Sequence, residues 1–305
     1  MKRSRMVVIT LILAVLMGVL GACSPAETYP LARKEIRIRD PFILVDDGKY
    51  YMYGTTDLED GSLRARNTFS VYVSADLENF SEPKTVVDGD ALDFWGTCDF
   101  WAPEVHKYNG RYYLFGSCRA EGMNRATQIF VCDTPDGAYV PLAETARTPK
   151  DWGCLDGTLF VDDGKPYMVF CREYTQVYDG EMWALPLSDD LTHPVGDPIF
   201  LFRASDNPTV EDVGKGFITD GPFLFREDGK IKMLWSSMAT VKYKKIYAVL
   251  EAQADSLLGP WTHFEGQYSF SGGHAMLFED LDGNRRLAMH TPNKADHERP
   301  VFFEY

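Results

Sequence analysis

Three aspartates and one histidine recur at matching places in the chain, each beside a proline or glycine at the start of an apolar run. Counted back from the glycine of the tight turn that follows, Asp40 and Asp156 lie eight residues away, and Asp220 and His274 lie nine. One aspartate alone is usually a turn or surface residue, but three in register are harder to dismiss. Two carboxyl groups in one pocket suit glycosidic bond cleavage, since one protonates the leaving oxygen and the other activates a nucleophile. A third carboxylate nearby raises the pKa of the acid.

A hairpin pattern that occurs five times must position these residues. Each copy has an apolar strand, a turn containing Asp-Gly or Asn-Gly, and a second strand rich in aromatic and aliphatic residues. Such turns favour hairpins because these residues tolerate a positive φ. The turn glycines, spaced 54 to 65 residues apart, are Gly48, Gly110, Gly164, Gly229 and Gly283.

These repeats predict an all-β fold, a five-bladed β-propeller. A β-sandwich is the competing fold, but it would not explain five copies at near-constant spacing. The first strand of each propeller blade lines the central channel, so the four side chains should meet at one mouth of it. The chain stops after three strands of the fifth unit, and a strand near Ile36 is expected to close the ring. Residues 36–305 then form one domain.

The N-terminal residues have the pattern of an export signal. Residues 1–22 combine a basic start with an apolar run of 14 residues, too short for a bilayer core of about 30 Å. The run ends in Leu20-Gly21-Ala22-Cys23, which resembles the lipobox of bacterial lipoproteins. The resemblance implies that Cys23 is lipidated and anchors the protein to the outer membrane, with residues 23–35 as a tether. We therefore expect an exported lipoprotein at the periplasmic face or the cell surface, with a plain signal peptide as the alternative.

The charge balance argues against nucleic-acid and anionic membrane partners. The 305 residues carry 31 Lys and Arg against 45 Asp and Glu, a net charge of −14. Removing residues 1–22 removes three cations and no anions, which leaves −17. Binding to nucleic acid needs a basic stripe that this chain lacks. A neutral sugar suits an acidic protein, and a monomer is expected.

The cysteines give no metal motif. Five remain besides Cys23, and none forms a CxxC pair, so zinc is not expected. Most should be small buried residues, although an oxidising compartment would allow one disulfide. The five are Cys98, Cys118, Cys132, Cys154 and Cys171.

Five motifs in fixed order resemble glycoside hydrolase family 43, the five-bladed arabinofuranosidases and xylosidases. The resemblance spans roughly residues 36–305. The motifs are Arg39-Asp40-Pro41, Trp101-Ala102-Pro103-Glu104-Val105, Asp156-Gly157-Thr158-Leu159-Phe160, Asp220-Gly221-Pro222 and Gly272-Gly273-His274.

The resemblance implies an inverting enzyme with Asp40 as general base and Asp156 as pKa modulator. The family usually has Glu as the general acid, where this chain has Asp220, whose side chain is one methylene shorter. A misplacement of about 1 Å costs on the order of a hundredfold in rate. Three interpretations follow. Asp220 is the acid; or Asp206 or Glu211 folds over the pocket and supplies it; or the site binds sugar without cleaving it.

Other side chains are candidates for holding the sugar or an ion. Aromatic rings near the channel mouth would present flat apolar faces to a sugar. His274 is similar to a family histidine that in some members helps to hold a metal, which adds calcium or another channel ion as an expectation. No cofactor is otherwise required. The substrate-binding candidates are Trp95, Trp101, Trp152 and Glu104, with Phe94 beside them.

The expected activity is that of an inverting exo-glycosidase that removes terminal arabinofuranose or xylose from plant oligosaccharides or polysaccharides. An α-L-arabinofuranosidase is the first expectation. A β-xylosidase or a galactose-specific member of the same family is the alternative, as is a propeller that binds carbohydrate without turnover. A protein scaffold is the weakest option, because a scaffold has no reason to direct carboxylates into its channel.

Overall fold

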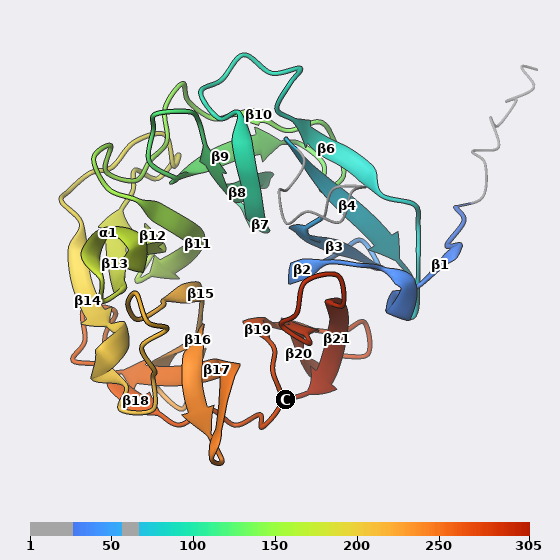
Figure 1. Ribbon diagram of the computed structural model, residues 1–305. Helices are drawn as coiled ribbons and strands as arrows, with labels where there is room; N and C mark the ends of the chain where they lie inside the picture. Colours follow the sequence, from blue (N-terminus) through green and yellow to red (C-terminus); the bar gives the residue numbers. More distant parts are fainter. Residues whose placement is uncertain (1–26, 57–66) are drawn as a thin grey trace, which may run out of the picture.

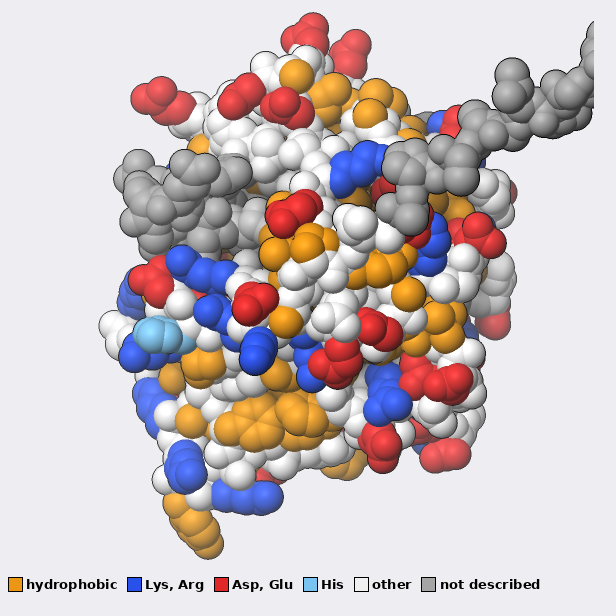
Figure 2. Space-filling model, turned by 90° about the vertical axis from the view of Figure 1, so that its right-hand side faces the viewer, with side chains coloured by type: hydrophobic (Ala, Val, Ile, Leu, Met, Phe, Trp, Pro, Cys, Tyr) orange, Lys and Arg blue, Asp and Glu red, His pale blue; other side chains and the backbone are white. Residues whose placement is uncertain are grey.

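The structure is a computed structural model that describes residues 27–56 and 67–305. The predicted export signal and Cys23 lie outside the described residues. Five antiparallel sheets follow one another around a central channel (Figure 1), which confirms the predicted five-bladed β-propeller. In the described ranges, no helix has the length and apolar character needed to cross a membrane. Figure 2 shows acidic and basic side chains interspersed on one side of the molecule, around small hydrophobic patches.

The strands follow the chain from blade to blade. Blade one contains β1 (Leu31–Ala32), β2 (Arg39–Asp46), β3 (Lys49–Thr55), β4 (Thr68–Ser74), β5 (Asn79–Phe80) and β6 (Lys84–Asp88). Blade two contains β7 (Cys98–Tyr108), β8 (Arg111–Arg119), β9 (Ala126–Cys132) and β10 (Val140–Pro141). Blade three contains β11 (Cys154–Asp162), β12 (Lys165–Arg172), β13 (Glu181–Pro186) and β14 (Ile199–Arg203). Blade four contains β15 (Asp220–Glu227), β16 (Lys230–Val241), β17 (Lys244–Ala254) and β18 (Thr262–Phe264). Blade five contains β19 (Gly273–Glu279), β20 (Arg285–Thr291) and β21 (Arg299–Glu304). Three short helical turns, η1 (Arg33–Glu35), α1 (Tyr174–Val177) and η2 (Ala204–Asp206), lie between strands.

The predicted hairpin turns join the first two strands of every blade. In four of them both turn residues have a positive φ, as in Asp47 (46°) and Gly48 (70°), the backbone of a type I′ turn. The fifth turn is longer, because the Asp280 amide bonds to the Asn284 carbonyl. Asp-Gly and Asn-Gly therefore mark the end of each inner strand, the name used here for β2, β7, β11, β15 and β19.

Each inner strand has a β-bulge near its beginning, at the opposite end from the turn. The pairing with the second strand skips two residues there, and one of them adopts a left-handed backbone with φ between 44° and 55°. A bulge of this kind bends the strand and redirects side chains. The five left-handed residues, called bulge residues below, are Asp40, Ala102, Asp156, Gly221 and His274.

The prediction that a strand near Ile36 closes the ring is wrong for the part of the chain that the structure describes. Blade five has three strands, and β1 pairs with β5 of blade one instead. The residues before Ile36 form the 3₁₀ turn η1, whose backbone accepts a hydrogen bond from Arg299 on β21 at Lys34. A helical turn cannot extend a sheet, so side chains make the contacts between η1 and blade five, as where the Arg33 guanidinium lies 5.3 Å from the centre of the Phe302 ring.

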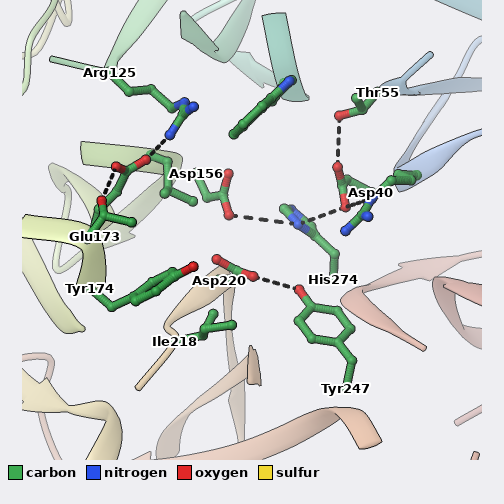
Figure 3. A pocket seen from close by; sticks show the side chains of 14 residues that line it. Asp40, Thr55, Arg125, Asp156, Glu173, Tyr174, Ile218, Asp220, Tyr247 and His274 are labelled. Atoms are coloured by element: carbon green, nitrogen blue, oxygen red, sulfur yellow. Dashed lines mark hydrogen bonds and ion pairs between the residues drawn. The ribbon is translucent and has the colours of Figure 1, made fainter. Parts of the chain in front are cut away.

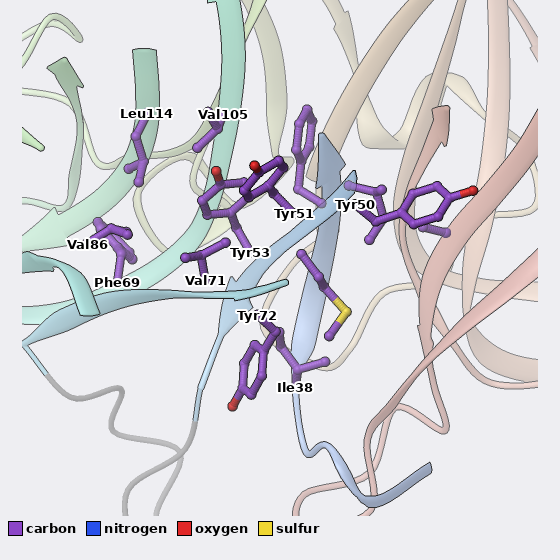
Figure 4. Close-up of a cluster of buried hydrophobic side chains, with 14 of the residues drawn as sticks. Ile38, Tyr50, Tyr51, Tyr53, Phe69, Val71, Tyr72, Val86, Val105 and Leu114 are labelled. Atoms are coloured by element: carbon purple, nitrogen blue, oxygen red, sulfur yellow. The ribbon is translucent and has the colours of Figure 1, made fainter. Parts of the chain in front are cut away.

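Hydrophobic side chains fill the space between neighbouring blades. Figure 4 shows Tyr53, Phe69 and Val71 of blade one near Val105 and Leu114 of blade two, and all five are buried. Alternation of large side chains along the strands supplies these contacts. The cysteines other than Cys23 are free thiols, so the described residues form no disulfide.

Candidate active site

A pocket of about 390 Å³ opens at the end of the channel where the inner strands begin. Its lining includes all four residues that the repeat pattern selected, and side chains from every blade contribute. Figure 3 shows Asp40 and Asp156 on either side of His274, with Asp220 next to Tyr247. The convergence predicted from the sequence is thus present in the structure.

Asp220 lies one position away from its predicted register. The bulge residue of blade four is Gly221, and Asp220 forms the last strand pair before the bulge. His274 is a true bulge residue, although it also lies nine residues before its turn glycine, because its turn is longer. The residues equivalent to Asp220 in the other blades are Arg39, Trp101, Leu155 and Gly273.

Asp40 is a buried carboxylate held in its ionised form. Its Oδ1 lies 3.3 Å from His274 Nδ1 and 3.9 Å from Arg39 Nε, and its Oδ2 accepts a hydrogen bond of 2.8 Å from Thr55 Oγ1. Burial alone would raise the pKa of Asp40, but the charge and hydrogen bond of His274, together with the charge of Arg39, hold it well below its usual range. An ionised carboxylate in a sugar-sized pocket is suited to accept a proton from water.

The two histidines near Asp40 have opposite protonation states. Burial opposes charge on His274, but the charges of Asp40 and Asp156 raise its pKa to about 10. Burial lowers the pKa of His290 to about 4, so this ring is neutral and its Nδ1 accepts the Asp40 amide at 3.2 Å. His274 is therefore the cation of the site.

The expected channel ion finds no set of ligands. In the described residues no group of three or more His, Cys, Asp or Glu side chains could hold a metal. The two carboxylates near His274 face its Nδ1, whereas its Nε2 is buried without a hydrogen-bond partner. A channel ion at this imidazole therefore stays a prediction.

Asp156 lies between blades three and four. Its Oδ2 accepts the Gly221 amide at 2.9 Å and lies 3.9 Å from His274 Nδ1. Burial, together with the charges of Asp220 and Asp40, raises the pKa of Asp156 to about 7 against the charge of His274. This carboxyl therefore titrates near neutral pH.

Asp220 has the character of a proton donor. Burial raises its pKa, as does the charge of Asp40, although the hydrogen bond of 2.9 Å from Tyr247 Oη to Oδ2 acts in the opposite direction. Asp156 is buried and its neighbour Asp220 is partly buried, and the two carboxyls cannot both ionise easily, so the pair retains a proton at a pH where Asp40 has none. The site can thus hold an ionised and a protonated carboxyl at the same time.

The pocket wall contains an ionic cluster that the sequence analysis missed. The Arg125 guanidinium lies 3.7 Å from the centre of the Trp101 ring, pairs with Asp99 at 2.9 Å and pairs with Glu173. Thr175 Oγ1 also donates to Glu173, at 2.9 Å. Glu173 is thus held in the pocket wall by its ion pair with Arg125 and its hydrogen bond from Thr175.

A usable signal for these wall residues existed in the sequence. The second strand of each blade returns to the pocket mouth, so residues directly after it lie beside the pocket. Glu173 and Tyr174 follow β12 in this way, and both line the pocket. Tyr247 has no such signal, because it lies within β17 and reaches Asp220 from the third strand.

Trp101 lines the pocket as predicted, but three other sugar-binding candidates do not. Trp95 donates from its indole nitrogen to Gln128 at 2.8 Å, and Trp152 packs on Trp183 with ring centres 4.7 Å apart. Glu104 is buried and lies 3.2 Å from His106 Nε2, further along the inner strand. Phe94 packs against Trp95 and also lies outside the lining. Residue type alone could not show which face of its strand or loop each side chain occupies.

The two alternative acids also lie outside the pocket lining. Asp206 caps the short turn η2, where its carboxylate accepts the Arg203 amide at 2.8 Å. Glu211 accepts a hydrogen bond of 2.6 Å from Thr240 and lies 3.9 Å from the Lys245 amine. Neither carboxylate reaches the pocket, which leaves Asp220 as the acid candidate.

A five-bladed propeller that holds an ionised and a protonated carboxyl in one pocket has the groups that hydrolysis of a glycosidic bond requires. The family model for glycosyl hydrolases family 43 matches residues 34–302, and the chain belongs to this family. The expected resemblance is therefore confirmed.

Known relatives agree with the family assignment. The crystal structure of endo-arabinase from Bacteroides thetaiotaomicron VPI-5482 is 40% identical with a TM-score of 0.82, and the match covers 92% of this chain and 98% of that one. The extracellular endo-alpha-(1->5)-L-arabinanase 1 of Bacillus subtilis is 22% identical over 84% of this chain and 77% of its own length. The probable arabinan endo-1,5-alpha-L-arabinosidase A of Emericella nidulans is 29% identical over 54% of this chain, and the match spans only 49% of that relative.

Proposed function

We propose that this glycoside hydrolase cleaves α-L-arabinofuranosyl bonds with inversion of configuration, removing terminal units from arabinan or its oligosaccharides. The observation that carries the proposal is the convergence of Asp40, Asp156, Asp220 and His274 in one pocket. There, His274 and Arg39 hold the pKa of Asp40 low, whereas burial raises the pKa values of Asp156 and Asp220. The names of the relatives support arabinan as the substrate, since those cited above are arabinases, arabinanases or arabinosidases.

The proposed reaction is a single displacement. Asp40 takes a proton from a water molecule, whose oxygen attacks the anomeric carbon as the glycosidic bond breaks. Asp220 gives its proton to the leaving oxygen, and exchange with solvent then restores both carboxyls. Asp156, whose pKa responds to the charge of Asp220, is the proposed modulator of that acid, and the His274 cation keeps Asp40 ionised.

The size of the pocket favours cleavage at the end of a chain. Its volume of about 390 Å³ lies at the low end of ligand pockets, which span roughly 300–1,000 Å³. The wall formed by Arg125, Glu173 and Tyr174 bounds it on one side. Endo cleavage, within the arabinan polymer, is the second candidate, because the names of several relatives describe endo-acting enzymes.

Two assays test the proposal. The first assay compares the turnover of three substrates: aryl α-L-arabinofuranoside, aryl β-D-xyloside and aryl β-D-galactoside. The second follows the hydrolysis of linear 1,5-arabinan by the size of the products. We expect turnover of the arabinofuranoside and release of arabinose alone. A ladder of oligosaccharides at early times would support the endo mode. Binding without turnover of any substrate would identify a carbohydrate-binding propeller instead.

We also propose that residues 1–22 export the protein and that lipidation of Cys23 anchors it to the outer membrane. The basic and apolar pattern of these residues supports the proposal. Labelling of growing bacterial cells with a clickable fatty acid tests it, with the substitution Cys23→Ser as control. We expect label only in the unsubstituted protein, and equal labelling of both would contradict the anchor.

A further inference from the structure

A repeated hydrogen bond joins neighbouring blades beneath the pocket. At four of the five contacts between successive inner strands, called seams here, a side chain on the second strand of one blade accepts the backbone N–H of the next blade's bulge residue. The bonds are Ala102 N–H to Thr55 Oγ1 (2.7 Å), Asp156 N–H to Ser117 Oγ (2.8 Å), His274 N–H to Ser236 Oγ (2.8 Å) and Asp40 N–H to His290 Nδ1 (3.2 Å).

The four acceptors occupy one register position. Each is the strand partner of the last paired residue before the bulge in its own blade, as Ser117 is of Trp101. In blade three this pairing joins Leu155 to Cys171, so Cys171 is the fifth member of the set. The seam between blades three and four therefore carries a thiol where the other seams carry a hydroxyl or an imidazole.

The amide at this seam has a different partner. Gly221 N–H donates to Asp156 Oδ2 at 2.9 Å, so the side chain of one bulge residue accepts the amide of the next. A thiol sulfur is a weak acceptor, and the Cys171 sulfur is fully buried, 3.9 Å from the Met182 sulfur. Gly221 is also sterically required, because a Cβ there would lie 2.7 Å from the His274 ring.

We propose that Cys171 is a positioning residue for Asp156: by not accepting the Gly221 amide, it leaves that amide to fix and stabilise the Asp156 carboxylate beside Asp220. The inference rests on the proposed function only in assigning Asp156 a part in catalysis. Hydroxyls accept the amide at three other seams. A hydroxyl at position 171 would therefore compete with Asp156 for the Gly221 amide. The thiol thus distinguishes the seam between blades three and four from the other four seams, where a hydroxyl or an imidazole accepts the amide.

Several groups besides Cys171 influence Asp156. The charged and titratable side chains that act on it, or on which it acts, come from four other strands and one loop. They are Asp40 (β2), Asp220 (β15), Tyr247 (β17), His274 (β19) and Arg125 in the loop between β8 and β9. A substitution at Cys171 leaves all of these in place and changes only the competition for the Gly221 amide.

Two substitutions at one site distinguish positioning from packing. Cys171→Ser adds an acceptor with little change in volume, whereas Cys171→Ala removes volume and adds no acceptor. We expect Cys171→Ser to lower kcat about ten- to a hundredfold with little change in KM, the range for a hydrogen bond to a charged group. The pH above which the activity of this variant falls should also be higher than in the wild type, because Asp156 then binds its proton more tightly. Cys171→Ala should keep kcat within about threefold and the same pH limit.

A packing role predicts the reverse order, with Cys171→Ala the more damaging change. Cys118→Ser is the matched control, since Cys118 is equally buried and adjoins the seam residue Ser117 without occupying a seam position. Thermal unfolding of all three variants separates loss of folding from loss of turnover. Full activity of Cys171→Ser, or an equal loss in Cys171→Ala, would overturn the proposal.

A readout without substrate keeps the inference separate from the proposed activity. In protein labelled with ¹⁵N-glycine, the Gly221 amide proton should shift with pH as Asp156 titrates, in the wild type and in Cys171→Ala. In Cys171→Ser this shift should disappear, because the amide has moved to the new hydroxyl. An unchanged titration in Cys171→Ser would contradict the positioning role even if no sugar substrate were found.

Discussion

The two ends of the inner strands use the same backbone device for different purposes. At the turn end, left-handed Asp or Asn residues such as Asp47 and Asp163 repeat in four blades and serve the hairpins. At the bulge end, left-handed residues repeat in all five blades, but their side chains differ from blade to blade. Uniform side chains accompany the structural role, and varied ones accompany the pocket.

The surroundings of the two ends differ in the same way. Near the turn end the channel is lined mostly by apolar side chains such as Phe42, Leu159 and Met276, with His106 among them. At the bulge end, four carboxyls and a histidine line one pocket. A fivefold repeat thus fixes where side chains point, and the departures from the repeat indicate where chemistry takes place.

The largest expected effect separates a bulge aspartate from a turn aspartate. Asp40→Asn should lower kcat about a hundred- to ten-thousandfold, because it removes the proton acceptor while keeping the shape of the side chain. Asp163→Asn, which retains a residue suited to the left-handed turn, should stay within about twofold. Steady-state kinetics on an aryl arabinofuranoside compare the two. Near-normal turnover by Asp40→Asn would remove Asp40 from the mechanism.

The next effect concerns the proton donor. Asp220→Ala should lower kcat about a hundredfold or more on natural oligosaccharides but much less on substrates with an activated leaving group, which needs no protonation. Azide should restore part of the lost rate. Glu211→Gln and Asp206→Asn are the controls and should leave turnover unchanged. A loss in Glu211→Gln that an activated leaving group rescues would transfer the acid role to that residue.

A smaller effect is expected from pH. The pKa of Asp156 is raised to about 7 and that of Asp220 is also raised, so the pair holds its proton below neutral pH and loses it above. Activity, measured as kcat/KM, should therefore fall about tenfold per pH unit above roughly pH 7. The pKa of Asp40 is lowered, so activity should persist below the usual range of an aspartate as long as the protein stays folded. A fall in kcat/KM that begins only above pH 9 would contradict the assignment of Asp156 and Asp220 as the pair that holds the proton.

The smallest effect on turnover is expected at the turn end. His106 pairs with the buried Glu104 at 3.2 Å, and its ring packs edge-on against Phe42 at 5.2 Å. His106→Gln should lower the Tm by a few degrees, corresponding to about 1–2 kcal/mol, and change kcat by less than about twofold. Calorimetry and kinetics on the same sample provide the test. A tenfold loss of kcat at unchanged Tm would show that the two ends are not functionally separate.

Sequence reasoning succeeded where the repeat determines geometry. The Asp-Gly and Asn-Gly turns located all five blades, and the register located Asp40, Asp156 and His274. It missed the shift of Asp220 by one position. The number of residues between Asp220 and its turn glycine depends on both the length of the turn and the position of the bulge, and the sequence does not separate the two. It also missed η1, since residues 33–35 have no pattern that distinguishes a helical turn from a strand.

The pocket wall was less predictable because it lies outside the repeat. Arg125 and Glu173 come from loops, and their ion pair depends on how two blades place those loops. The sequence makes Trp95 and Trp152 candidates for sugar binding, but both rings contact other side chains instead. A sequence shows which side chains can stack on a sugar, whereas loop packing decides which of them reach it.

The most direct test of the account is the anomeric form of the first product. Proton NMR during the early hydrolysis of an α-1,5-linked arabino-oligosaccharide, at high enzyme concentration, follows the new sugar before it mutarotates. The account predicts that β-arabinose appears first, because water activated by Asp40 attacks the face opposite the leaving oxygen protonated by Asp220. First appearance of the α-anomer, or no hydrolysis by a folded enzyme, would contradict it.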